Sequence, residues 1–162
     1  MKAIFFLIFI FCSILSCYSQ TNQEFIDRGI SKIGQQDFKG AIEDFSKAIE
    51  LNPSDVKAYN NRGLTKFIMK DYQGALIDFS KVIELDPKNT EAYILRGISK
   101  KEQKDYQGAI KDFDKALELN PNEAKAYNFR GAAKNLLGPQ GSGSSDLKKA
   151  EELGFKKENG KQ

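Results

Sequence analysis

Residues 56–89 have the sequence VKAYNNRGLTKFIMKDYQGALIDFSKVIELDPKN, and residues 90–123 continue with TEAYILRGISKKEQKDYQGAIKDFDKALELNPNE. The two segments align without a gap and share their aromatic, Arg-Gly, Asp-Tyr-Gln-Gly-Ala and proline positions. The same pattern extends to both sides with a period of 34 residues, as the aromatic positions show: Phe25, Tyr59, Tyr93 and Tyr127. A fixed period of this length predicts a repeat architecture.

Within one unit, the apolar residues are spaced as on an α-helix. In the first unit Ala41, Phe45 and Ala48 fall on one helical face, and Ile26 and Ile30 mark an earlier helix. Each second helix follows an aspartate suited to accept free backbone N–H groups, and it ends before a proline, which disfavours helix at the preceding residue. The capping aspartates are Asp37, Asp71 and Asp105, and the prolines are Pro53, Pro87 and Pro121. Each unit is therefore predicted to be a helix, a tight turn and a second helix.

One hairpin of this kind cannot cover its own apolar face, so the units are predicted to stack. Small residues twelve positions apart indicate where paired helices approach most closely. These pairs are Gly29 with Ala41, Gly63 with Ala75, Gly97 with Ala109 and Gly131 with Gly143. A larger side chain at these positions would overpack the interface at a cost of about 1–3 kcal/mol.

The pattern Tyr-x-x-Arg-Gly, Ala-x-x-x-Phe and Pro, repeated every 34 residues, resembles the tetratricopeptide repeat. The resemblance covers about residues 22–157 and implies an all-α fold, a right-handed α-solenoid of about four helix–turn–helix repeats. We expect units at 22–55, 56–89, 90–123 and 124–157, and a loose tail at 158–162. The sequence departs from the family in having Tyr or Phe for the leading Trp, and arginine where leucine is usual. The spacing and the small residues survive these changes, so the expected fold is unaffected.

The fourth unit is irregular. It has GPQGSGSS at residues 138–145, where its neighbours have Asp-Tyr-Gln-Gly-Ala. Glycine and serine weaken a helix, so the last helix is expected to begin late or to fray, and the sequence leaves open whether residues 139–145 are helical. The segment Leu153-Gly154-Phe155 predicts a glycine C-cap in place of the proline, and the polar residues before it indicate a capping helix.

An arginine precedes an aspartate by sixteen residues in every unit. The pairs are Arg28 with Asp44, Arg62 with Asp78, Arg96 with Asp112, and Arg130 with Asp146. In a helical hairpin this separation can place the two side chains across the seam between the helices. We therefore predict four partly buried structural ion pairs, in which losing one partner harms the fold more than losing both. A phosphate-binding site is the alternative role for these arginines.

In the family that this chain resembles, the first helix of each pair lines the concave side of the superhelix. The resemblance therefore implies a non-catalytic module that binds a protein partner, as a peptide or a helix, in this groove. Helical phase gives the candidate groove residues as Ile26, Ile30, Asn60, Asn61, Leu64, Phe67, Ile94, Ile98, Lys101 and Asn128. The alternative for each of them is that it fills the core between units.

Chaperone-binding members of the family hold a C-terminal carboxylate with Lys and Asn in one unit, Asn in the next, and Lys and Arg in the third. The corresponding residues here are Ile26, Ile30, Asn61, Glu91 and Leu95, of which only Asn61 agrees. Because Glu91 would repel a carboxylate, the sequence argues against this mode of binding.

The composition argues against catalysis. The chain has no histidine, and both of its cysteines, Cys12 and Cys17, precede the repeats. Histidine is the usual acid–base group near neutral pH and the usual metal ligand. Since a Gly-rich phosphate loop and a metal-ligand cluster are also missing from the sequence, we expect no enzyme activity, cofactor, metal or small-molecule substrate. Basic and acidic residues alternate along the chain, so we also expect no nucleic-acid partner.

The first twenty residues resemble an export signal. Lys2 precedes a mostly apolar run from Ala3 to Leu15, and small residues follow it. As a helix this run would measure about 20 Å, too short for a hydrocarbon core of roughly 30 Å. Cleavage after Ser19 would remove residues 1–19 as a signal peptide and leave a soluble protein, secreted or in a bacterial periplasm.

A second cleavage site lies before Cys17. The residues Ile14-Leu15-Ser16-Cys17 resemble the bacterial lipoprotein pattern, although Leu15 stands where a smaller residue is usual. Cleavage here would make Cys17 a lipidation site. The alternative function is then a lipid-anchored structural or assembly component, a scaffold in a bacterial cell envelope complex. In either case we expect membrane contact only through the leader or a lipid. The oligomeric state stays open.

Overall fold

The structure is a computed structural model, and it describes residues 21–156. This part of the chain consists of helices joined by turns and contains no strand. The predicted leader at 1–19, with Cys17, and the predicted tail at 158–162 lie outside the described residues.

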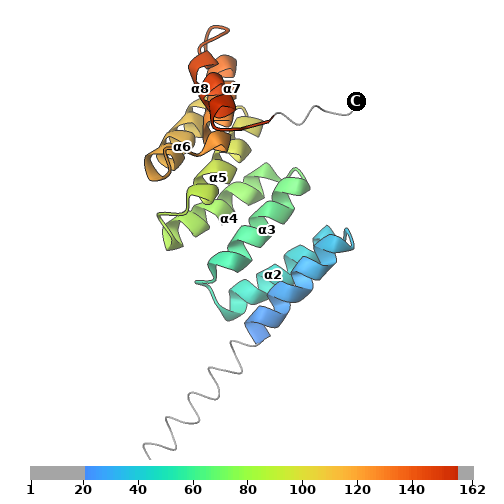
Figure 1. The fold of residues 1–162 in the computed structure, drawn as a ribbon. Coiled ribbons are helices and arrows are strands. Elements are labelled where there is room, and N and C mark those ends of the chain that lie inside the picture. The colour runs from blue at the N-terminus through green and yellow to red at the C-terminus, as the bar shows by residue number, and fades with distance from the viewer. Residues whose placement is uncertain (1–20, 157–162) are drawn as a thin grey trace, which may run out of the picture.

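A helix covers residues 21–34, and seven more follow it. They are α2 (Phe38–Leu51), α3 (Val56–Ile68), α4 (Tyr72–Leu85), α5 (Thr90–Glu102), α6 (Tyr106–Leu119), α7 (Ala124–Leu137) and α8 (Ser144–Glu152). Each helix from α2 onward packs chiefly against its neighbours along the chain, and Figure 1 shows the hairpins stacked one upon another. The predicted fold class, an α-solenoid of helix–turn–helix repeats, is confirmed.

Between residues 21 and 156, every helix is too short or too polar to cross a lipid bilayer.

Side-chain caps fix where the second helices begin. The carboxylates of Asp37, Asp71 and Asp105 accept hydrogen bonds from backbone N–H groups three residues later, at 3.0, 2.9 and 2.9 Å. These N–H groups have no partner within the helix, so each bond stabilises its N-terminus. The helices end at Leu51, Leu85 and Leu119, two residues before a proline. The caps and the stops therefore lie where the sequence predicted them.

Glycine on the first helix of each unit allows the second helix to pack closely. A Cβ added at Gly29, Gly63 or Gly97 would lie 2.6–2.9 Å from the ring of Phe45, Phe79 or Phe113, each of which is fully buried. The nearest atoms thus belong to a phenylalanine sixteen residues later, and not to the alanine twelve residues later that the sequence suggested. In the fourth unit the nearest atoms do belong to the residue twelve positions away, because a Cβ at Gly143 would clash with the Gly131 carbonyl oxygen.

The last helix is shortened at its start. It begins at Ser144 and has nine residues, whereas α2, α4 and α6 have fourteen each. Residues 138–143 form bends and turns, with Gly141 at a φ of 93°. At the other end Gly154 has a φ of 87°, and the N–H groups of Gly154 and Phe155 donate to the carbonyls of Glu151 and Ala150. This glycine C-cap turns the chain back, so that the Phe155 ring packs edge-on against Phe129, with 6.5 Å between centroids.

Candidate functional site

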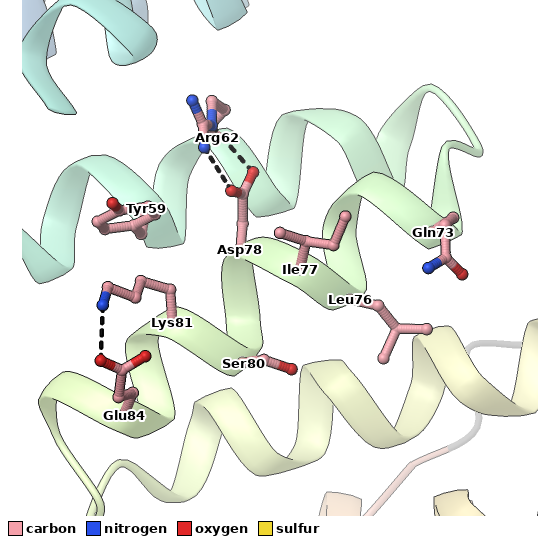
Figure 2. A pocket seen from close by; sticks show the side chains of 9 residues that line it. All are labelled: Tyr59, Arg62, Gln73, Leu76, Ile77, Asp78, Ser80, Lys81 and Glu84. Carbon is pink, nitrogen blue, oxygen red and sulfur yellow. Dashed lines mark hydrogen bonds and ion pairs between the residues drawn. The ribbon is translucent and has the colours of Figure 1, made fainter. Parts of the chain in front are cut away.

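Two surfaces carry the predicted site residues. The seam is the contact between the two helices of one unit, and the groove is the surface formed by the first helices of successive units. At the seam of the second unit, Arg62 Nε and Nη2 donate to Asp78 Oδ2 and Oδ1 at 3.0 and 2.6 Å. The Asp78 side chain is fully buried, and this bidentate pair is shown in Figure 2. Charge-assisted bonds of this geometry are among the strongest in proteins.

The same bidentate arrangement recurs in the other three units. The Nη2–Oδ1 distances are 2.5 Å for Arg28 with Asp44, 2.7 Å for Arg96 with Asp112, and 2.6 Å for Arg130 with Asp146. All four predicted pairs therefore cross the seam of their own unit. In each of them the carboxylate is almost completely buried.

A lysine that the sequence analysis missed joins each pair. In the second unit Lys66 Nζ lies 2.7 Å from Asp78 Oδ2. The other lysines that contact the seam aspartates are Lys32, Lys100 and Lys134, at 2.9, 2.8 and 2.7 Å. Each lysine follows the arginine of its unit by four residues, one helical turn, so its 34-residue recurrence was the available signal. The seam is therefore a row of Arg–Asp–Lys triads.

The arginines also connect neighbouring units. The third nitrogen of Arg62, Nη1, donates to Ser46 Oγ of the preceding unit at 3.0 Å. Arg96 and Arg130 make the equivalent bonds to Ser80 and Asp114, at 3.3 and 2.7 Å. Because all three nitrogens of these arginines already donate to protein oxygens, the geometry favours a structural role for them over the phosphate-binding alternative.

Two of the triads lower the pKa of their aspartate. Hydrogen bonds from Arg28, and to a smaller extent from Lys32, lower the pKa of Asp44 to about 2. For Asp146 burial acts in the opposite direction, but hydrogen bonds from Arg130 and Lys134 outweigh it and lower the pKa. These carboxylates are therefore charged at neutral pH and held by two cations each.

A hollow of about 670 Å³, which we call the outer hollow, lies between α3 and α4 beside the seam, and Figure 2 shows the side chains that line it. Its charged side chains are paired with one another, Arg62 with Asp78 and Lys81 with Glu84, the latter pair at 2.6 Å. Its most exposed apolar residue is Ile77, at 61%. Most of its wall comes from the second helix of the unit, so this hollow lies outside the predicted groove.

A hollow of about 520 Å³ lies between α5 and α7, the first helices of the third and fourth units. We call it the α5–α7 hollow. Two predicted groove residues, Ile94 and Ile98, line it. Ile94 is buried, with 5% of its surface exposed. The complete lining is Thr90, Glu91, Ile94, Leu95, Ile98, Glu123, Lys125 and Phe129. Its charged residues stand at the starts of the two helices, and its apolar residues lie on the turns that follow.

Ile26 does not belong to the groove. It is 1% exposed and packs in a core cluster with Ala41, Phe45, Ala48 and Ala58. Helical phase placed it correctly on an apolar face, but that face packs against the second helix and the next unit. Ile26 therefore faces the core, and its side chain is closed to a partner.

The remaining predicted groove residues lie apart from the α5–α7 hollow. Ile30 is 49% exposed, and Lys101 forms an ion pair with the adjacent Glu102 at 2.6 Å. Asn128 lines a separate hollow of about 130 Å³ near Phe155. On α3, the predicted groove residues Asn60, Asn61, Leu64 and Phe67 are half-buried. The Phe67 ring packs edge-on against Tyr72, 5.4 Å between centroids, at the turn of its own unit.

The groove prediction missed an apolar wall made of Leu95 and Phe129. These residues occupy the same position in adjacent units, one residue after Ile94 and Asn128. Phe129 is held from two sides, because its ring stacks on Phe113 at 6.1 Å and meets Phe155 at 6.5 Å. The signal in the sequence was an apolar residue at this position in the third and fourth units alone. The first two units have Asp27 and Asn61 there.

Models of known protein families match the chain across its central part. A tetratricopeptide repeat model matches residues 56–89 and 90–123, and a second model, described as a TPR repeat, matches residues 33–69. Together the matches extend over residues 33–123, more than half of the chain. No curated protein matches the chain.

Several solved structures resemble most of the array of helices. MamA (41-end) from Desulfovibrio magneticus RS-1 superposes with a TM-score of 0.76 at 23% identity, over 82% of this chain and 75% of that chain. The first TPR domain of Spaghetti (RPAP3), bound to HSP90 peptide SRMEEVD, gives 0.70 at 26% identity, over 74% of this chain and 94% of that one. The Arabidopsis OM64 TPR domain gives 0.67 at 26% identity, over 72% and 96%.

Proposed function

Since this chain belongs to the tetratricopeptide repeat family, we propose that it is a non-catalytic module that binds a peptide or helix of another protein in its groove. The observation that carries the proposal is the α5–α7 hollow, because apolar side chains there line a cavity between the first helices of two units. Ligand sites in proteins are commonly concave and apolar, with a few polar groups at their edge.

The chemistry of the rest of the molecule supports a binding role. The buried carboxylates of the seam are each neutralised by an arginine and a lysine of the same unit, so they serve the fold. Within residues 21–156, no three histidine, cysteine or acidic side chains are grouped so as to hold a metal ion. A structural neighbour, the Spaghetti domain, is bound to a peptide, which is the class of partner we propose here.

Comparing a double substitution with a single one tests the groove. Leu95→Ser with Ile98→Ser places two hydroxyls in the α5–α7 hollow, whereas Ile77→Ser changes an equally apolar residue in the outer hollow. A partner is first captured from an extract of the source organism and identified, and its affinity for each purified variant is then measured by calorimetry. The groove variant should lose most of the affinity while its helical circular dichroism persists, and the Ile77 variant should bind normally. Equal binding by both variants would place the partner elsewhere.

We also propose that the protein is exported and acts in a bacterial periplasm or outside the cell. The basic, apolar and small-residue segments of residues 1–19 support this placement. The second candidate function, a lipid-anchored component of an envelope assembly, is favoured by Ile14-Leu15-Ser16 preceding Cys17. Mass spectrometry of the mature N-terminus separates the two: Gln20 without lipid supports the soluble module, and an acylated Cys17 supports the anchored component.

A further inference from the structure

We propose that the α5–α7 hollow selects a peptide segment in which an aliphatic side chain lies beside a lysine or arginine, and that Glu91 recognises the cation. This inference rests on the proposed binding function and specifies the partner for that site. Its basis is the combination of an apolar cavity and a net negative edge in one place.

The apolar part of the hollow is preformed. Ile94 is buried beneath it, and the half-buried Leu95 and Ile98 leave part of their surfaces open. Phe129 closes the other wall, where its contacts with Phe113 and Phe155 fix the ring. An aliphatic side chain entering the hollow therefore meets apolar atoms on several sides without reordering the protein, which reduces the entropic cost of binding.

The charges at the edge favour a cation. Glu91 is exposed at the first turn of α5, and its carboxylate forms no hydrogen bond or ion pair among residues 21–156. The Glu123 carboxylate accepts only a 3.3 Å bond from the Asn120 amide, and Lys125 supplies the single positive charge in the lining. The edge therefore has two carboxylates against one ammonium group, and the exposed Glu91 is the one without a partner.

The position of Glu91 in the repeat separates a binding role from a structural one. An acidic residue in the first turn of a helix stabilises it through the helix dipole. However, the same position holds Gln23, Lys57 and Lys125 in the other units, so helices of this fold form without an acid there. The acidic side chain at this position occurs only in the third unit, on one of the two first helices that line the apolar hollow.

The same charge disfavours an acidic partner. The peptide in the Spaghetti structure, SRMEEVD, ends in acidic residues. A carboxylate brought to the α5–α7 hollow would instead meet Glu91 and Glu123 without an arginine in the lining. The attraction between opposite charges at an exposed edge contributes modestly to the binding free energy. We therefore expect a preference of about three- to tenfold for basic over acidic peptides, and this preference should decrease as salt is added.

Selection from a random dodecapeptide display library tests the inference on three purified full-length chains: the wild type, Glu91→Lys and Glu102→Lys. Glu102 lies at the far end of α5 beside Lys101, so it controls for the change in net charge. Wild type and Glu102→Lys should enrich peptides with Lys or Arg next to Leu, Ile or Val. Selection on Glu91→Lys should enrich Asp or Glu next to the aliphatic residue instead. The affinities of the synthesised peptides, measured by fluorescence anisotropy, should show the same preferences.

Two outcomes overturn the inference in distinguishable ways. In the first outcome, the selected peptides no longer bind the double variant Leu95→Ser with Ile98→Ser, but the peptides selected on wild type and on Glu91→Lys have the same charges. This result would refute the role of Glu91 and leave groove binding intact. Peptides that bind this double variant as well as wild type, or a selection without any enrichment, would refute groove binding itself.

Discussion

The seam and the groove share one 34-residue period but use it differently. At the seam every unit repeats the same Arg–Asp–Lys triad, and three units repeat the same glycine against the same buried phenylalanine. On the first helices, the position that lines the hollow changes from unit to unit, through Asp27, Asn61, Leu95 and Phe129. The residues that repeat hold the fold, and those that vary give each part of the groove its own chemistry.

The fourth unit shows how strictly the seam is kept. Its second helix has lost its first residues, Gly143 and Leu147 replace the usual alanine and phenylalanine, and no aspartate caps it. Nevertheless, Arg130 and Lys134 hold Asp146 as their counterparts do in the other units. The triad is therefore the feature of the hairpin that survives when the rest is altered.

The largest effect should come from breaking one triad. Asp78→Ala leaves Arg62 and Lys66 without their carboxylate in a largely buried seam, so the free energy of unfolding should fall by about 3–5 kcal/mol. Denaturation in urea, followed by circular dichroism, measures the change. Replacing all three residues, as Asp78→Leu with Arg62→Met and Lys66→Met, should cost less than the single substitution. A triple variant less stable than Asp78→Ala would contradict this account of the seam.

A smaller loss should follow from filling the space between the helices. A Cβ at Gly97 lies 2.7 Å from the Phe113 ring, so Gly97→Val forces the two helices of the third unit apart and should cost about 1–3 kcal/mol. Gly34 offers a matched control, because a Cβ there meets nothing within 4 Å. Gly34→Ala should leave the melting temperature unchanged or raise it. Equal losses in the two variants would mean that the close approach at Gly97 is unimportant.

The third prediction concerns the pH dependence of stability, which tests the charged state of the seam. The pKa of Asp44 is lowered to about 2 in the folded protein, below its ordinary value of 3.8, because Arg28 hydrogen-bonds the charged form. A group with a lowered folded pKa adds stability above its unfolded pKa, and this contribution is lost as pH falls from about 4 towards 2. Melting temperatures should therefore fall less steeply over this range in Asp44→Asn than in wild type. Melting temperatures that fall equally steeply in the two proteins would contradict this role of the ion pair.

The sequence predicted the seam better than the groove, for physical reasons. Sixteen residues across a helical hairpin define one register, so the Arg62–Asp78 pair could be placed from spacing alone. The groove depends on which of two apolar faces of a first helix turns away from its neighbours, and spacing leaves this undecided. Ile26 and Phe129 were misjudged for that reason, since one faces the core and the other lines the hollow. The contact of Phe155 with Phe129 depends on the chain reversal at Gly154, which periodicity does not encode.

Site-specific photo-crosslinking measures most directly whether a partner occupies the groove. Benzoylphenylalanine is introduced at Ile98 in the α5–α7 hollow or, in a second chain, at Ile77 in the outer hollow, and each chain is irradiated in its native cells. The account predicts one partner polypeptide attached to position 98 and absent from position 77. Attachment of the same partner at position 77 and not at position 98 would contradict it.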